Sequence, residues 1–87
     1  MEHSIQYYAA HLVGKTITQW DDLSNKTRSV VAKRVALDIS GVVNVYGDNT
    51  TVIRVSPERI DQLIETGQAM VRGQIEGQIY IIRWWIK

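Results

Sequence analysis

The C-terminal run from Gln78 to Ile86 constrains this chain more than any other feature, because it is apolar on both faces of a strand. In an extended backbone, successive side chains point to opposite faces. One face would carry Tyr80, Ile82, Trp84 and Ile86, and the other Ile79, Ile81, Arg83 and Trp85. The sequence therefore predicts a strand that is central in a sheet, or one whose second face meets another surface.

The segment before this strand fits two structures. Glu76-Gly77 resembles the Asp-Gly dipeptide of a two-residue hairpin turn, which would make residues 69–75 a strand with Tyr80 opposite Gly73. Alternatively, the preceding helix continues through Gly67 to Gly73. A glycine inside a helix costs about 1 kcal/mol relative to alanine. We prefer the hairpin for that reason.

A second hairpin is predicted where two β-rich runs flank Gly47-Asp48-Asn49-Thr50. An odd loop, such as Gly47-Asp48-Asn49, separates apolar from polar side chains, whereas an even loop mixes them. With the odd loop, one face carries Val43, Val45, Ile53 and Val55, and the other carries Val42, Asn44, Tyr46, Val52 and Arg54. We therefore expect the odd loop.

Two short helices have clear boundaries in the sequence. In residues 5–12 the apolar side chains recur at helical spacing, and Gly14 ends the segment. Ser56-Pro57-Glu58 is a typical helix start, with a capping serine, a proline at the first helical position and an acid near the positive end of the dipole.

A longer helix is predicted between them, with Ser24 as its N-cap, an end near Ile39 and a stop at Gly41. Its apolar face would consist of Val31, Ala32, Val35, Ala36 and Ile39. Residues 15–18 would be a connector and residues 20–23 a single turn. The predicted order is ααββαββ: an α+β class, single compact domain over residues 1–87, with a mostly antiparallel four-stranded sheet and helices on one face.

Composition excludes several classes of protein. The 87 residues contain no cysteine, so neither a disulfide nor a thiolate-bound metal is expected, which suits a reducing cytosol. The start lacks a secretory signal, and no apolar run approaches the roughly 18 residues of a membrane helix. We expect a cytoplasmic protein that does not enter the membrane.

Charge argues against a duplex DNA binder. Ten basic residues face nine acidic ones, for a formal charge of +1. DNA-binding proteins normally show a basic excess, because neutralising phosphates supplies much of their affinity. Nucleic acid is therefore a possible partner, but the net charge does not favour it.

No pattern of catalytic or metal-binding residues stands out. His3 and His11 are eight positions apart, whereas a helical metal pair needs a spacing of three or four. The acid pair Asp21-Asp22 precedes the predicted long helix, where acids favour the dipole. On that helix Lys26, Lys33 and Arg34 would form a basic, solvated stripe. We expect a non-enzymatic protein without a metal or cofactor.

The predicted sheet has one face rich in aromatic and arginine side chains. Its candidate partner-binding residues are Asn44, Tyr46, Arg54, Arg83 and Trp85. Aromatic and arginine residues are enriched at interface hot spots, and they also stack on single-stranded bases. The face would bind a protein partner, bind single-stranded nucleic acid or a nucleotide, form a homodimer seam, or be covered by a helix.

The segment from Trp20 to Arg28 resembles the Trp-x-x-Leu turn and capped helix found in many short phage proteins. Together with the small size, it is similar in style to phage accessory and anti-defence proteins of the anti-CRISPR kind. That resemblance implies an inhibitor that occupies the surface of a host protein, and it transfers no functional residue. The expected function is a non-catalytic protein-binding module.

Overall fold

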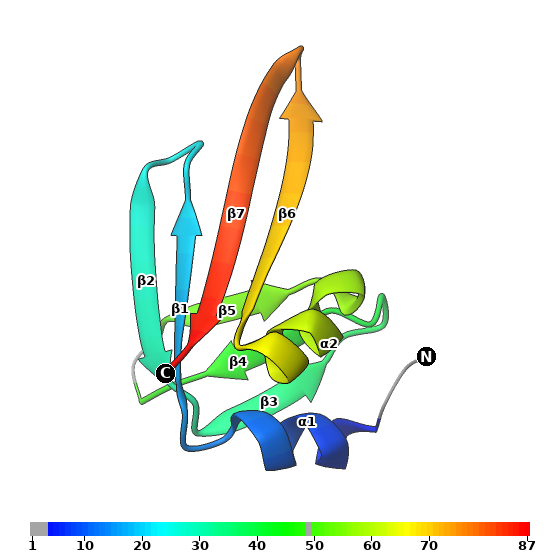
Figure 1. The fold of residues 1–87 in the computed structure, drawn as a ribbon. Coiled ribbons are helices and arrows are strands. Elements are labelled where there is room, and N and C mark those ends of the chain that lie inside the picture. The colour runs from blue at the N-terminus through cyan, green and yellow to red at the C-terminus, as the bar shows by residue number, and fades with distance from the viewer. Residues whose placement is uncertain (1–3, 49) are drawn as a thin grey trace.

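The computed structural model describes residues 4–48 and 50–87, and it folds them into two antiparallel sheets and two helices (Figure 1). The helices are α1 (Ile5–Leu12) and α2 (Pro57–Thr66). The strands are β1 (Thr16–Asp21), β2 (Lys26–Val31), β3 (Arg34–Leu37), β4 (Val43–Tyr46), β5 (Val52–Val55), β6 (Gln68–Ile75) and β7 (Gln78–Ile86). The α+β class is as predicted, but the predicted order of elements is wrong.

The predicted single sheet is also wrong, because the two predicted hairpins join different sheets. The four-stranded sheet has the order β2-β1-β7-β6, and the three-stranded sheet has the order β3-β4-β5. The chain passes from one sheet to the other at Ala32 and Lys33, between β2 and β3. Figure 1 shows the β6–β7 hairpin projecting beyond the rest of the fold, with the shorter β1–β2 hairpin beside it.

The predicted helix from Ser24 to about Ile39 is wrong, since this region forms β2 and β3. The predicted connector at 15–18 and the turn at 20–23 are wrong as well, because β1 covers most of both. The basic stripe of Lys26, Lys33 and Arg34 therefore does not exist as one helix face. The segment from Trp20 to Arg28 likewise contains the end of β1, a turn and the start of β2, without a capped helix.

Two local effects explain why this region forms strands and not the predicted helix. Thr27, Val30, Val31 and Val35 are β-branched, and such side chains lose rotamer freedom in a helix but pack well in a sheet. In addition, the Asp21 carboxylate accepts hydrogen bonds from Leu23 N at 3.0 Å and Ser24 Oγ at 3.2 Å. This arrangement is a side-chain turn, so Ser24 belongs to a hairpin loop and not to a helix N-cap.

The odd loop and the sorting of faces predicted for the β4–β5 hairpin are confirmed, although the loop is two residues longer than Gly47-Asp48-Asn49. Val43 lies opposite Val55, Asn44 opposite Arg54, and Tyr46 opposite Val52. The loop therefore spans residues 47–51, an odd number, and Asn49 within it lies outside the described residues. Apolar and polar side chains are sorted to opposite faces as expected.

The predicted hairpin of residues 69–86 is confirmed too, with β6 beginning one residue earlier, at Gln68. Gly67 ends α2 with a φ of +82°, so β6 begins directly after the helix. Glu76 and Gly77 both have positive φ, as a type I′ turn requires. Tyr80 lies opposite Gly73, and a Cβ at Gly73 would overlap the Tyr80 ring. The tyrosine therefore covers the space that the glycine leaves in the strand.

The hydrophobic core lies where the two sheets and the helices meet. α1 contacts β3, whereas α2 contacts β6 and β7, so the helices do not share one face of a single sheet as predicted. The fully buried large side chains are Leu12, Ile17, Val43, Val45, Ile53, Val55, Ile60 and Leu63. Within residues 4–48 and 50–87, no helix is long and apolar enough to cross a membrane.

Candidate functional site

The candidate residues predicted from sequence lie on two different sheets. Asn44 and Tyr46 are on β4 and Arg54 is on β5, whereas Arg83 and Trp85 are on β7. The expectation that they share one sheet face is therefore wrong, because the two hairpins were assigned to one sheet. Tyr46 and Trp85 are both partly exposed, so neither is a simple core residue.

On the three-stranded sheet, the polar candidates bond to one another. Arg54 donates from Nε to Asn44 Oδ1 at 3.0 Å and from Nη2 to Asp38 Oδ2 at 3.0 Å. The Arg34 guanidinium lies 4.1 Å from the centroid of the Tyr46 ring, which is cation–π geometry. These groups satisfy each other within the fold and form a polar outer face of this sheet.

Asp38 is the centre of that polar network. Its carboxylate accepts hydrogen bonds from Ser40 N and Oγ, from Val42 N and from Arg54. The Ser40 hydroxyl bond is the largest of the effects that lower the pKa of Asp38 from 3.8 to about 2, and the backbone amides and Arg54 add to it. This cluster fixes the turn between β3 and β4, which is a structural role.

The four-stranded sheet has one face in the core. Ile17 lies opposite both Val30 and Ile86, and Ala69 lies opposite Trp84. Opposite residues of antiparallel strands share a face, and nearly all of these side chains are buried. Trp84 also donates its indole N–H to Gln19 Oε1 at 2.9 Å, so its polar atom is satisfied on the core side.

The other face of this sheet is the strongest candidate for a functional surface, and we call it the open face. By strand register it consists of Thr16, Thr18, Trp20, Thr27, Ser29, Val31, Gln68, Met70, Arg72, Gln74, Ile79, Ile81, Arg83 and Trp85. Among the described residues, none packs onto it as a further layer, and none of its members is acidic.

Large apolar side chains are unusually exposed on the open face. Ile79 is 57% exposed, and Met70 and Val31 are each 46% exposed. Trp20 and Trp85 are partly exposed, and Trp20 lies directly opposite Arg83 across the β1–β7 pair. Clusters of exposed apolar and aromatic residues of this kind mark interaction surfaces in soluble proteins.

Sequence reasoning identified Arg83 and Trp85 on this face but missed Trp20, Met70 and Arg72. The missed signal is the alternation of Thr16 to Trp20, in which β-branched and aromatic residues occupy every second position. Had that segment been assigned as a strand, Trp20 would have joined the surface of Trp85.

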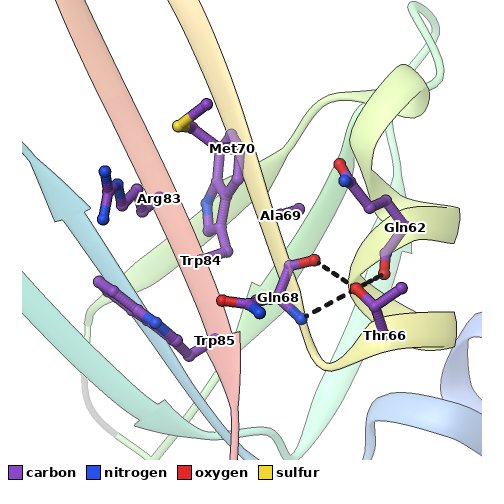
Figure 2. Close-up of a pocket in the computed structure, with 8 residues that line it drawn as sticks. All are labelled: Gln62, Thr66, Gln68, Ala69, Met70, Arg83, Trp84 and Trp85. Atoms are coloured by element: carbon purple, nitrogen blue, oxygen red, sulfur yellow. Dashed lines mark hydrogen bonds between the residues drawn. The ribbon is translucent and has the colours of Figure 1, made fainter.

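A pocket of about 360 Å³ lies at the start of β6 (Figure 2). It is lined by Gln62, Thr66, Gln68, Ala69, Met70, Arg83, Trp84 and Trp85. Figure 2 shows Gln62 and Thr66 of α2 on one side of β6 and Arg83 and Trp85 of β7 on the other. Its lining mixes amides, a hydroxyl and indoles, which suits a peptide or another mixed polar and apolar ligand.

The acidic pair singled out in the sequence has structural partners. Asp22 Oδ1 accepts a hydrogen bond from Ile81 N at 2.8 Å, and Asp21 holds the β1–β2 turn. His3 lies outside the described residues, and the described chain has no group of three potential metal ligands. The chain matches no family model, no curated protein and no solved structure, so the open face and the pocket beside it are the features that point to a function.

Proposed function

We propose that this protein is a non-catalytic protein-binding module, and that its contact surface is the open face of the four-stranded sheet. The observation that carries the proposal is the exposure of Ile79, Met70 and Val31 on one face together with Trp20 and Trp85. Burying such side chains against a partner is favourable by about 25 cal/mol per Å² of apolar area.

The chemistry of the face favours a protein over other partners. Ile79, Ile81 and Met70 offer no groups that hydrogen-bond to bases or sugars, but they fit the apolar centre of a protein interface. Arg72 and Arg83 supply charge beside that centre. A protein partner with apolar and acidic side chains would complement both features.

An inhibitor of a host protein is a specific form of this proposal, and of the likeness to phage accessory proteins only the small size still supports it, since residues 20–28 form no capped helix. Steric inhibition needs only a surface that binds tightly, and it needs no catalytic group in the bound protein. Asp21, Asp22 and Asp38 already serve turns and backbone amides, which supports a role without catalysis.

The test is an affinity pull-down from a lysate of the cells in which the protein is made. The variant Ile81→Ser with Trp85→Ser removes apolar area from the open face, and Val52→Thr makes a smaller polar change on the outer face of the other sheet. We expect a protein retained by the wild type and by Val52→Thr but lost by the double variant. Equal recovery by all three proteins would place the contact elsewhere, and no recovery above background would contradict the proposal.

A second candidate function is single-stranded nucleic-acid binding, which the arginines beside the tryptophans of the open face favour. Base stacking on an aromatic side chain is worth about 1–3 kcal/mol, and arginine adds charge. A salt titration with a labelled oligothymidylate tests it, with Trp85→Ser expected to weaken binding about tenfold or more. The absence of binding even at low salt would remove this candidate.

A further inference from the structure

The outer edge of β6 presents unpaired main-chain groups in a regular row. The two-residue turn makes Ile75 and Gln78 a hydrogen-bonded pair, and Ile86 N donates to Gly67 O at 2.9 Å at the other end of the hairpin. Both polar groups of a residue point to the same side of an antiparallel strand, and this side alternates along the strand. The groups of Met70, Arg72 and Gln74 therefore point away from β7, where no strand of the described chain pairs with them.

The two edges of the four-stranded sheet differ in how they are protected. β2 carries Lys26 and Arg28, charged side chains of the kind that discourage pairing at a sheet edge. β6 is longer, contains no proline or lysine, and has Arg72 as its only charged residue. An edge of this kind is a ready template for another strand.

The start of the β6 edge is closed by the fold itself. Thr66 Oγ1 donates to Gln68 O at 2.7 Å and lies 2.8 Å from Gln62 O, and it accepts from Gln68 N at 3.4 Å. The outward groups of Gln68 are thus already occupied, and the free row begins at Met70. The pocket beside Thr66 and Met70 lies at this point, where it would receive a side chain of an added strand.

We propose that β6 is a docking edge, at which an extended segment of a partner protein pairs with residues 70–74 as a fifth strand and sets a carboxylate against Arg72. The main-chain row would give affinity, and the pocket and the arginine would give specificity. Opposite charges on paired strands stabilise the pairing. Asp22 lies opposite Ile81 just beyond β1, but its carboxylate accepts from Ile81 N, and among the described residues no carboxylate forms an ion pair with Arg72. This inference rests on the proposed protein-binding function and adds the form of the partner.

The probe for the test is a displayed library of linear peptides of about nine residues, the length of a long strand. We expect selected peptides to carry an acidic residue and to slow hydrogen exchange at the amides of Met70, Arg72 and Gln74 about tenfold or more. The amides of Thr27 and Val31 on the β2 edge should not change.

A proline variant isolates the main-chain contribution. Arg72→Pro removes an outward N–H without breaking a β6–β7 bond. Thr27→Pro makes the matched change on β2. Because Ala32 N donates to Lys15 O, the main-chain N–H groups of the odd-numbered β2 residues point away from β1. We expect Arg72→Pro to lose peptide binding about tenfold or more, and Thr27→Pro to retain it. Should Arg72→Pro fail to fold, N-methylation of alternate peptide amides tests the same bonds.

Four results would overturn the docking edge, and the last of them would leave the proposed function intact. One is a library that yields no binder, and another is a peptide that binds Arg72→Pro as well as the wild type. The third is protection of the β6 amides without peptide in a protein that sediments as a dimer, because a second copy then occupies the edge. Peptides or partners that need Trp85 but leave the β6 amides unprotected would keep the proposed function and reject strand addition.

Discussion

The outer faces of the two sheets differ in how their side chains are satisfied. On the three-stranded sheet, Arg54 bonds to Asn44 and Asp38, and Arg34 lies on Tyr46. On the open face of the four-stranded sheet, Ile79 and its apolar neighbours are exposed. Antiparallel sheets with one solvated face normally place polar residues there. The first sheet is therefore complete as it stands, whereas the second has a face suited to a further partner.

The core-facing sides of the two sheets differ in how completely their side chains are buried. Val43, Val45, Ile53 and Val55 of the three-stranded sheet are fully buried, whereas the four-stranded sheet has a core face that is buried only near its base. Figure 1 shows the β6–β7 hairpin extending beyond both α1 and α2. Stability should thus depend mainly on the small sheet and the base of the large one, and binding on the projecting part.

The largest loss of stability is expected from a substitution at the centre of the three-stranded sheet. Ile53→Thr removes apolar volume at a side chain with 0% exposure and places a hydroxyl where it has no water. Cavity formation and an unsatisfied polar group together should lower the free energy of unfolding by about 2–4 kcal/mol. Urea unfolding followed by tryptophan fluorescence measures it. A loss below about 1 kcal/mol would mean that the small sheet is not the main source of stability.

A smaller, pH-dependent effect is expected at Asp38. Because its folded pKa of about 2 lies below the 3.8 of the unfolded chain, its charge stabilises the fold above about pH 4, and that stabilisation disappears as the pH falls toward 2. Asp38→Asn should therefore be less stable than the wild type near pH 6, with the difference shrinking between pH 4 and 2. Urea midpoints over this range measure it.

The matched control for Asp38 is Asp48→Asn. The Asp48 side chain is 84% exposed and lies 4.0 Å from Lys33 Nζ, an ion pair that solvent screens strongly. We expect its midpoints to follow those of the wild type at every pH. A pH-independent loss in Asp38→Asn would show that the geometry of the turn matters there, and not the charge.

Local sequence signals predicted the β4–β5 hairpin, the β6–β7 hairpin and the two helices. The turn at Glu76-Gly77 and the sorting of Val45 from Asn44 each depend on residues a few positions apart. Such short-range rules fix register and turn type without knowledge of the rest of the chain.

The long predicted helix failed because its apolar spacing fits two structures. Val31, Ala32 and Val35 recur at helical intervals, but β2 pairs with β1 across a short turn held by Asp21, and the strand alternation of Thr16 to Trp20 was missed. The site prediction failed for the same reason: Trp85 was joined to Tyr46, whereas its sheet neighbours come from β1 and β6. Strand partners far apart in sequence are set by the packing of the whole core.

The smallest loss of stability is expected from Ile79→Thr, the same isoleucine-to-threonine change that is proposed above for Ile53. Ile79→Thr keeps a β-branched side chain at a position that is 57% exposed, so the free energy of unfolding should change by no more than about 0.5 kcal/mol. The same chemical change thus tests both sheets, and the ratio of the two losses measures how far the open face lies outside the core. If Ile79→Thr costs nearly as much as Ile53→Thr in a monomer, another part of the chain covers this face. If the cost depends on protein concentration, a second copy covers it.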